Sequence, residues 1–391
     1  MKRILFVDDE PNVVGGLRRM LYPRRNQWDI AFAGSGREAL QRLGESSFDI
    51  LVTDVRMPEM SGAELLGEVR MHFPQTTRIV LSGAADSDLA LRTATLAHQY
   101  LCKPCDAQAL RSTLDRACTV RETLDDPGLR KLISGIDALP TLPAIYLELY
   151  LALRSGDVSA KDVAALIAQD MAMTAKVLQL VNSGLFGTPR NITSVADAVT
   201  YLGMETVRTL ALRVMVFTQF NDPALDSFAE RLSAHSLQVG ALARKIAESS
   251  QFAGVTADDC FAAGLLHDIG KLILADGRPV EFQGALQDAR RSGLTASQAE
   301  TQLFGATHAE IGAYLLRLWG LPDCVTEAVA LHHKTDGLKG GAAMAVHVAD
   351  AVAHNHVNPA LDINAVAEAG LTEHLPGWQQ LQSEPPELRL Q

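Results

Sequence analysis

The chain has 391 residues, of which 47% are hydrophobic and 21% are charged, and its net charge is −11. This length is too great for one hydrophobic core, and the negative charge argues against nucleic-acid binding, which requires clustered lysine and arginine. No apolar run reaches the roughly 20 residues of a membrane helix, and the five cysteines do not suggest a disulfide framework, so we expect a protein of the reducing cytoplasm.

Short apolar runs alternate with helix-like segments at the start of the chain. The runs predict strands at 3–8, 48–54, 78–82 and 98–103, and the segments between them predict helices at 11–22, 35–45, 61–72, 86–95 and 106–124. Short buried strands that alternate with helices are typical of a doubly wound, flavodoxin-like α/β domain with a parallel sheet. The first run is not expected to be a signal peptide, because acidic residues follow it directly.

Polar side chains stand where these predicted strands end. In open α/β sheets, functional groups gather at the carboxyl ends of the strands. Here those ends carry Asp8, Asp9, Asp54, Ser82 and Lys103. Carboxylates brought together repel one another unless a hard cation such as Mg²⁺ lies among them, and the lysine adds a second positive charge. The set suits transfer of a phosphoryl group to a carboxylate.

Residues 1–120 resemble the receiver domain of two-component response regulators. The resemblance is carried, in order and spacing, by VDDE (7–10), TDVRMPEMSG (53–62), LSG (81–83) and KP (103–104). It implies that Asp54 accepts a phosphoryl group from a sensor histidine kinase and that Asp8 and Asp9 hold Mg²⁺. It further implies that Ser82 and Lys103 contact the phosphoryl group.

The same resemblance gives a role to the surface around the last predicted strand. Tyr100 matches the aromatic switch position of receiver domains. The helix 86–95 and the strand 98–101 form a face through which many receivers dimerise, so a homodimer is a candidate assembly.

The sequence Asp125-Asp126-Pro127-Gly128 is a strong stop and turn signal after the helix 106–124. We therefore predict these boundaries: a receiver domain at 1–122, a linker at 123–137, a helical domain at 138–370 and a C-terminal tail at 371–391.

Helical periodicity replaces the strand alternation from residue 144 onward, which predicts an all-α domain. The predicted helices are 144–155, 159–168, 172–183, 194–201, 204–220, 227–250, 257–274, 280–292, 295–303, 307–319, 322–333 and 342–355.

Histidines and aspartates occupy inward-facing positions in five of these helices. They are His235, His267, Asp268, His308, His332, His333 and Asp350. For a single one, a core histidine bonded to a carbonyl is the simpler interpretation, but burying all seven without a shared purpose would be costly. Such groups together suit one or two ions of Fe, Mn or Zn. A metal-free pocket held by His–Asp hydrogen bonds is the alternative.

These residues resemble the metal ligands of the HD superfamily, especially the HD-GYP cyclic-di-GMP phosphodiesterases. The match runs through HDIGK (267–271), HAEIG (308–312) and the paired histidines at 332–333. It implies a multinuclear metal centre whose activated water attacks a phosphodiester, assisted by Lys271. Two features differ: the segment after His333 lacks the Gly-Tyr-Pro motif and is shorter, and residues 139–212 have no counterpart in those enzymes.

Residues 135–335 resemble another HD relative, the HDOD domain, which is a helical module of signalling proteins. The resemblance is carried by LPTLPAIY (139–146), VNSGLFG (181–187) and YLGMETVR (201–208). HDOD domains are usually described as lacking the full metal set and any established catalytic activity, whereas this sequence keeps the set.

Together, these resemblances imply a response regulator of a phosphorelay. Phosphorylation at Asp54 would control an HDOD output domain that acts by binding a protein or nucleotide partner, and we favour a protein. The alternative is a metal-dependent phosphodiesterase or phosphohydrolase acting on a cyclic dinucleotide or nucleotide. The retained ligands favour the enzyme, and the missing Gly-Tyr-Pro loop favours the binding module. A DNA-binding regulator is disfavoured, because no basic recognition helix is present.

Overall fold

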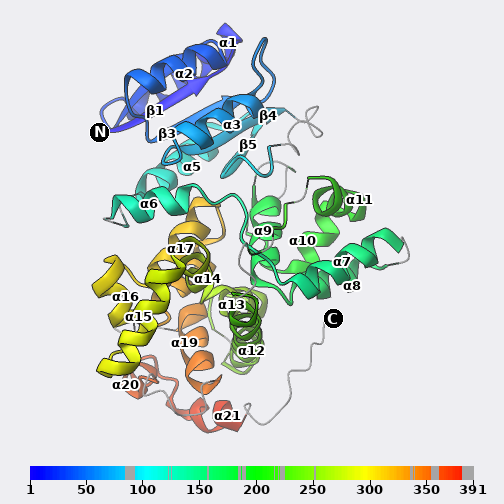
Figure 1. Cartoon of the computed structure of the whole chain (residues 1–391), viewed down its shortest axis with the longest axis vertical. Coiled ribbons are helices and arrows are strands. Elements are labelled where there is room, and N and C mark those ends of the chain that lie inside the picture. The colour runs from blue at the N-terminus through cyan, green and yellow to red at the C-terminus, as the bar shows by residue number, and fades with distance from the viewer. Residues whose placement is uncertain are drawn as a thin grey trace.

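The protein consists of a parallel α/β part and a helical part. In Figure 1 the α/β part lies at the top and the helical part lies below it. The predicted helix 86–95 falls largely outside the residues that the structure describes. This computed structural model describes residues 1–83, 93–121, 123–124, 126–155, 158–183, 186, 191–214, 216–218, 220, 225–250, 252–334, 338, 340–353 and 361–380.

The α/β part is built on a parallel sheet with the strand order β2-β1-β3-β4-β5. Its strands are β1 (Lys2–Val7), β2 (Trp28–Ala33), β3 (Ile50–Asp54), β4 (Thr77–Gly83) and β5 (Gln99–Lys103). Its helices are α1 (Pro11–Leu21), the short η1 (Tyr22–Arg24), α2 (Gly36–Glu45), α3 (Gly62–His72) and α5 (Ala107–Val120).

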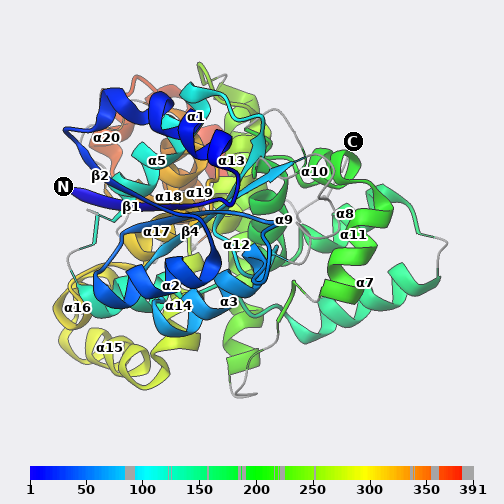
Figure 2. The ribbon, with the colours of Figure 1, turned by 90° about the horizontal axis from the view of Figure 1, so that it is seen from above.

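Helices cover both faces of this sheet, which confirms the predicted doubly wound fold. Alternate residues of β1 divide between two apolar clusters: Ile4 and Phe6 pack on one face, and Leu5 and Val7 pack on the other. Figure 2 shows α1 and α5 on one side of the strands and α2 and α3 on the other. The sequence prediction omitted β2, because Asp29 interrupts a short run that lies at the edge of the sheet.

The second part is helical, as predicted, and none of the helices in the described ranges is long and apolar enough to span a membrane. It begins with α6 (Pro127–Ser134), α7 (Pro143–Ser155), α8 (Ala160–Ile167), α9 (Met171–Asn182), α10 (Val195–Leu202), α11 (Met204–Thr209) and the π-helical turn η4 (Leu210–Val214). It continues with α12 (Asp226–Ser250), α13 (Ala257–Leu266), α14 (Ile269–Gly277), α15 (Pro279–Ser292), α16 (Ala296–Phe304) and α17 (His308–Leu318). It ends with α18 (Asp323–Leu331), α19 (Gly341–Ala353), α20 (Ile363–Glu368), η6 (Thr372–His374) and α21 (Leu375–Gln380).

Two predicted helices are shorter than expected. The helix predicted at 204–220 ends with η4, and beyond it Thr218 pairs with Pro140 in an isolated parallel bridge. The helix predicted at 257–274 breaks at His267 and Asp268 into α13 and α14. The apolar periodicity continues through this break, so the sequence pattern alone does not reveal it.

A buried polar interface joins the two parts, and α17 packs against both α5 and α6 beside it. Arg78 of β4 is 0% exposed and donates hydrogen bonds to Asp137 Oδ1 at 2.7 Å and to the carbonyl oxygen of Leu96 at 2.7 Å. Arg70 forms a second ion pair with Asp137 at 2.6 Å. A buried guanidinium is costly unless it is paired, so these contacts hold the linker segment against the sheet.

Lys176 of α9 enters the same interface from the helical part. It is 1% exposed, and its Nζ donates to the carbonyl oxygens of Ala94 at 2.8 Å and Asp137 at 2.6 Å. The ammonium also lies 5.3 Å from the ring centroid of Trp319, within the range of a cation–π interaction. Lys176 therefore links the receiver loop before β5 to the helical domain.

The β5 face was expected to be exposed and suitable for dimerisation, but the helical part covers the start of this strand. Gln99 Nε2 donates to the carbonyl oxygen of Leu318 at 2.9 Å, and Gln179 Nε2 donates to that of His98 at 3.1 Å. Both His98 and Gln99 are buried. This edge of the sheet is therefore used within the chain.

The ionisation of Lys176 gives a testable pH dependence. Burial lowers the pKa of Lys176 to about 7, against a smaller opposing effect of Asp137. A lysine in the unfolded chain titrates near 10.4, so between about pH 7 and pH 10 the unfolded chain binds more protons, and stability rises with pH by up to about 1.4 kcal/mol per unit.

Thermal unfolding of the wild type and the Lys176→Met variant from pH 7 to pH 9 tests this expectation. The Tm of the wild type is expected to rise relative to that of the variant as the pH increases. A constant difference between the two proteins would contradict a depressed pKa at Lys176.

Candidate functional site

The structure brings three of the predicted receiver residues into direct contact. Asp54 ends β3, Asp8 follows β1 and Lys103 ends β5. Lys103 Nζ donates hydrogen bonds to Asp8 Oδ2 at 2.8 Å and to Asp54 Oδ1, while the backbone N–H of Arg56 donates to Asp54 Oδ2 at 2.8 Å. The parallel order of β1, β3, β4 and β5 explains this meeting, because their carboxyl ends share one edge.

The electrostatics of this pocket favour a bound cation. Burial raises the pKa of Asp54, and the hydrogen bond and charge of Lys103 offset only part of that effect. Burial acts to lower the pKa of Lys103, but the hydrogen bonds and charges of Asp54 and Asp8 outweigh this effect. The pKa of Lys103 is therefore raised above its usual value, and the ammonium stays charged. Asp9, which follows Asp8, is exposed. Asp8, Asp9 and Asp54 offer carboxylate oxygens, which are the ligands that Mg²⁺ prefers.

The other two predicted receiver residues lie on β4 and β5. Ser82 is buried and follows Leu81, which is the register partner of Asp54. Tyr100 is buried, and its hydroxyl donates to the carbonyl oxygen of Thr93, next to Ala94, which accepts from Lys176. The predicted switch residue therefore contacts the loop that Lys176 holds.

The seven predicted metal-ligand residues converge in the helical part from five places in the chain. His235 lies in α12, His267 and Asp268 at the α13–α14 break, His308 at the start of α17, His332 and His333 after α18, and Asp350 in α19. Ligand group A comprises His308, His332 and His333, and ligand group B comprises His235, His267 and Asp268. Within each group the ligand atoms lie within 4.8 Å of one another.

Asp268 lies between the two ligand groups. Its Oδ1 is 3.2 Å from His308 Nε2, and its Oδ2 is 3.4 Å from His267 Nε2. The seventh residue, Asp350, lies 3.0 Å from His235 Nε2 and 3.7 Å from His267 Nε2. A single carboxylate thus reaches both ligand groups, as a bridging ligand would.

The hydrogen bonds of the histidines leave ligand atoms free. Nδ1 of His267 contacts the carbonyl oxygen of Gly264 at 2.7 Å, and Nδ1 of His332 contacts that of Val329 at 2.8 Å. Each Nδ1 is thereby protonated, so Nε2 is the ring nitrogen that faces the cluster and is available as a ligand atom when it is unprotonated. Three buried atoms at the centre have no hydrogen-bond partner among the described residues: His267 Nε2, His332 Nε2 and Asp268 Oδ1. Such orphaned acceptors fit a metal ion better than a metal-free pocket.

Lys271 neutralises part of the charge of this cluster. Its Nζ donates to Asp268 Oδ2 at 2.6 Å. Burial acts to raise the pKa of Asp268, but His267 and Lys271 hold it well below its usual range. Asp268 is therefore an anion, which is the form in which a carboxyl group binds a metal ion.

Close backbone packing on both sides of the α13–α14 break positions His267 and Asp268. A Cβ atom at Gly270 would lie 1.9 Å from the carbonyl oxygen of His308, so only glycine allows α14 to approach the start of α17. Likewise, a Cβ atom at Gly264 would lie 2.8 Å from the Cα of Gly240, where α13 crosses α12. These crossings bring His267 and Asp268 to His308 and His235.

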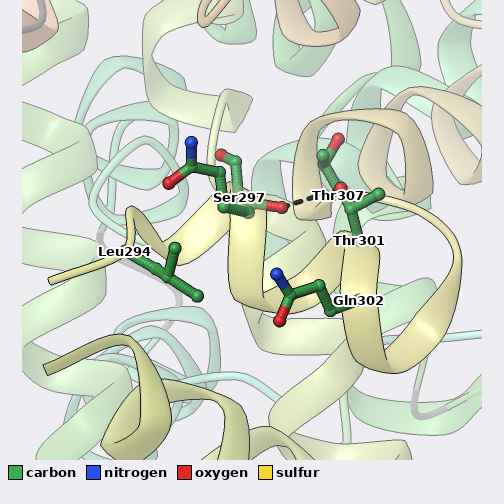
Figure 3. A pocket seen from close by; sticks show the side chains of 6 residues that line it. Leu294, Ser297, Thr301, Gln302 and Thr307 are labelled. Atoms are coloured by element: carbon green, nitrogen blue, oxygen red, sulfur yellow. Dashed lines mark hydrogen bonds between the residues drawn. The ribbon is translucent and has the colours of Figure 1, made fainter. Parts of the chain in front are cut away.

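A surface pocket of about 390 Å³ lies beside α16, outside the seven-residue cluster (Figure 3). It is lined by Leu294, Ser297, Gln298, Thr301, Gln302 and Thr307. Thr301 Oγ1 donates to the carbonyl oxygen of Ser297 at 2.8 Å. Its lining includes no carboxylate, imidazole or ammonium group, so it offers nothing for metal or acid–base chemistry.

Comparison with known proteins decides the family. A model described as "HDOD domain" matches residues 139–335, which is half of the chain, and a model described as "Response regulator receiver domain" matches residues 4–115. The chain belongs to the HDOD family. Its receiver domain implies a phosphodonor such as a histidine kinase and, in general, Mg²⁺ binding, so the combination with the HDOD domain is that of a response regulator.

Individual relatives cover one or both domains. An uncharacterized protein of Treponema pallidum (strain Nichols) is 28% identical over 198 residues, 51% of this chain and 38% of that protein. Transcriptional regulatory protein ZraR of Escherichia coli (strain K12) is 33% identical over 123 residues, 31% of this chain and 27% of ZraR. This chain thus spans well under two thirds of either relative. The solved MmoQ response regulator from Methylococcus capsulatus str. Bath has a TM-score of 0.51 at 27% identity, covering 62% of this chain and 98% of that structure.

The site predicted from the sequence did not include two residues that lie around the HDOD cluster. Glu300 of α16 contacts His308, and His347 of α19 contacts the carbonyl oxygen of His332 through Nδ1 at 2.9 Å. His347 shares a helix with Asp350, which was its only signal in the sequence. Glu300 lies in a polar segment that resembles a solvent-exposed helix, so no pattern marked it.

The contact at Gly270 predicts a large effect of a small substitution. Gly270→Ala is expected to destabilise the protein by about 1–3 kcal/mol, because the methyl group overlaps the His308 carbonyl. Gly284→Ala in α15 is the matched control, because its methyl group would meet nothing within 4 Å. Denaturant unfolding measures both, and equal stability of the two variants would contradict the close packing of α14 and α17.

Proposed function

We propose that phosphorylation of Asp54 by a histidine kinase controls the HDOD domain, which acts as an output module by binding a partner protein. The observation that carries this proposal is that Lys103 Nζ donates hydrogen bonds to both Asp54 and Asp8, two buried carboxylates at the carboxyl edge of the sheet. Transfer requires the Asp54 carboxylate as acceptor and positive charge around the incoming phosphoryl oxygens. Lys103 supplies one charge, and Mg²⁺ held by Asp8, Asp9 and Asp54 would supply the other.

The strands of the receiver offer a direct route from this pocket to the HDOD domain. Ser82 and Arg78 lie four residues apart on β4, as do Lys103 and Gln99 on β5, so each pair spans about 13 Å on one side of the sheet. Arg78 and Gln99 are the residues that contact the linker and α17. A movement of Ser82 or Lys103 on phosphorylation of Asp54 would therefore be passed along β4 and β5 to the buried interface between the receiver and the HDOD domain.

A protein partner is supported by an apolar stripe on α7. Leu147 and Leu151 are 56% and 57% exposed and lie one turn apart on the same face. Exposed apolar groups that gather on one face are typical of protein-binding surfaces.

Phosphorylation is tested by incubating the full chain with Mg²⁺ and a radiolabelled acyl phosphate. The wild type is expected to take up label on one carboxylate, and Asp54→Asn is expected to take up none. Asp288→Asn, which removes an exposed aspartate from α15, serves as the control and is expected to be labelled like the wild type. Equal labelling of the Asp54→Asn variant would contradict the assignment.

The ligand groups favour a second candidate, a metal-dependent phosphodiesterase or phosphohydrolase acting on a cyclic dinucleotide or nucleotide. The orphaned atoms of His267, His332 and Asp268 fit Fe, Mn or Zn, held by ligand groups A and B together with Asp350. A bound ion would supply Lewis-acid stabilisation of phosphoryl oxygens. Lys271 would hold Asp268 in place and add positive charge next to the substrate.

Metal analysis of the full chain, purified without chelator or histidine tag, tests the metal site. The wild type is expected to contain near-stoichiometric Fe, Mn or Zn, and Asp268→Ala is expected to lose it. Asp276→Ala, which removes an exposed carboxylate from α14, is expected to retain the ion. If the wild type is folded and metal-free, the hydrolase candidate fails, and if it holds metal, a screen of cyclic dinucleotides follows.

A further inference from the structure

Glu300 is a buried carboxylate in α16, and the two residues that follow it are polar and exposed. It is 0% exposed, while Thr301 and Gln302, which follow it in α16, face the pocket in Figure 3. A glutamate is almost never fully buried unless it is paired, because removing its charge from water is costly. Its position therefore requires a specific partner inside the domain.

That partner is His308. Glu300 Oε2 accepts hydrogen bonds from His308 Nδ1 at 2.6 Å and from the backbone N–H of His308 at 2.8 Å. Glu300 Oε1 has no hydrogen-bond partner among the described residues. The carboxylate thus fixes both the start of α17 and the rotation of the His308 ring.

The contact also fixes which nitrogen of His308 is available. With Nδ1–H donated to Glu300, Nε2 is the ring nitrogen that faces the ligand group, and in the neutral tautomer it carries the lone pair. This Nε2 lies 3.2 Å from Asp268 Oδ1 and 3.1 Å from His333 Nε2. A ring lone pair next to a carboxylate oxygen requires a proton or a cation between the two atoms. In the metal-free protein a proton on Nε2 would pair His308 with Asp268, and a divalent ion can take the place of that proton.

Glu300 distinguishes the two ligand groups. His267 of group B and His332 of group A use backbone carbonyls as Nδ1 acceptors, whereas His308 uses a carboxylate. Group A has three imidazoles and no carboxylate of its own, so an ion there would share Asp268 with group B. A carboxylate that accepts from a ligand imidazole makes the imidazole a stronger donor to metal and adds negative charge.

We propose that Glu300 is the positioning residue of ligand group A: it orients His308 through Nδ1 and sets the affinity of this group for a divalent metal ion. This inference rests on the proposed metal site. Among the described residues, the side-chain hydrogen bonds of Glu300 go to His308 of ligand group A alone, so removing the carboxylate weakens the ion position of this group selectively.

Two substitutions separate the hydrogen bond from the charge. Glu300→Gln keeps the shape and an acceptor for Nδ1 but removes the charge, and Glu300→Ala removes both. Glu327→Gln is the matched control, because it makes the same charge change at an exposed position of α18. Circular dichroism and Tm measurements check that each variant is folded. If Glu300→Ala fails to fold, the isosteric Glu300→Gln variant is used for the test.

The measurements are metal stoichiometry and the Kd for Zn²⁺ and Mn²⁺, obtained by chelator competition on the full chain. We expect Glu300→Gln to weaken one of two binding steps by about 10–100-fold and to leave the other unchanged. Glu300→Ala is expected to weaken the same step at least as much, and Glu327→Gln neither step. Nitrogen-15 NMR of the histidine rings adds a readout independent of metal: His308 is expected as the Nδ1–H tautomer in the wild type and as a mixture in Glu300→Ala.

The outcomes distinguish this inference from the metal site on which it rests. If the wild type binds two ions and both Glu300 variants bind them with unchanged Kd, the role of Glu300 is overturned and the metal site stands. If both binding steps weaken equally, the selectivity for ligand group A is overturned. If the wild type binds no ion at all, the metal site fails and the role of Glu300 fails with it.

Discussion

Two buried basic side chains from different domains meet at Asp137, and this meeting makes the receiver and the HDOD domain one structural unit. Arg78 of the receiver pairs with the Asp137 carboxylate, while Lys176 of α9 donates to its carbonyl oxygen. Removing one partner of a buried ion pair typically costs about 3–5 kcal/mol, because the other charge is left unpaired. The domains therefore cannot separate without exposing or stranding these groups. Lys176 also donates to the carbonyl oxygen of Ala94 in the loop before β5, so one side chain of α9 contacts both this loop and the linker.

The same constraint shapes the cluster around Asp268. A buried carboxylate must be paired, and here Lys271, His267 and His308 surround it. In a metal-free protein these contacts would suffice for charge, but they leave the orphaned ring nitrogens unexplained. A metal ion would satisfy those atoms and the anion together. The cluster is thus arranged like a metal site, whichever output the domain performs.

The sequence predicted the parts of the molecule that follow from local patterns. Alternating apolar runs predicted the sheet, and because parallel strands share one carboxyl edge, Asp54 and Lys103 could be placed together before the structure was known. The break at Asp268 could not be predicted, because the apolar periodicity continues through it, and the close approach of Gly270 to α17 that accompanies it is a tertiary contact. No pattern in the sequence marked three buried charged residues, Glu300, Arg78 and Lys176. A charged residue is expected to be exposed unless a partner far away in the sequence is known.

Hydrogen–deuterium exchange of the full chain, with and without an acyl phosphate and Mg²⁺, tests the central claim that the receiver acts on the HDOD domain through the buried interface. Phosphorylation is expected to change amide exchange in β5 and in α9, which carries Lys176, and Asp54→Asn is expected to show no change. If Asp54 is fully phosphorylated and exchange in α9 is unaltered, the interface does not transmit the signal and the account is wrong.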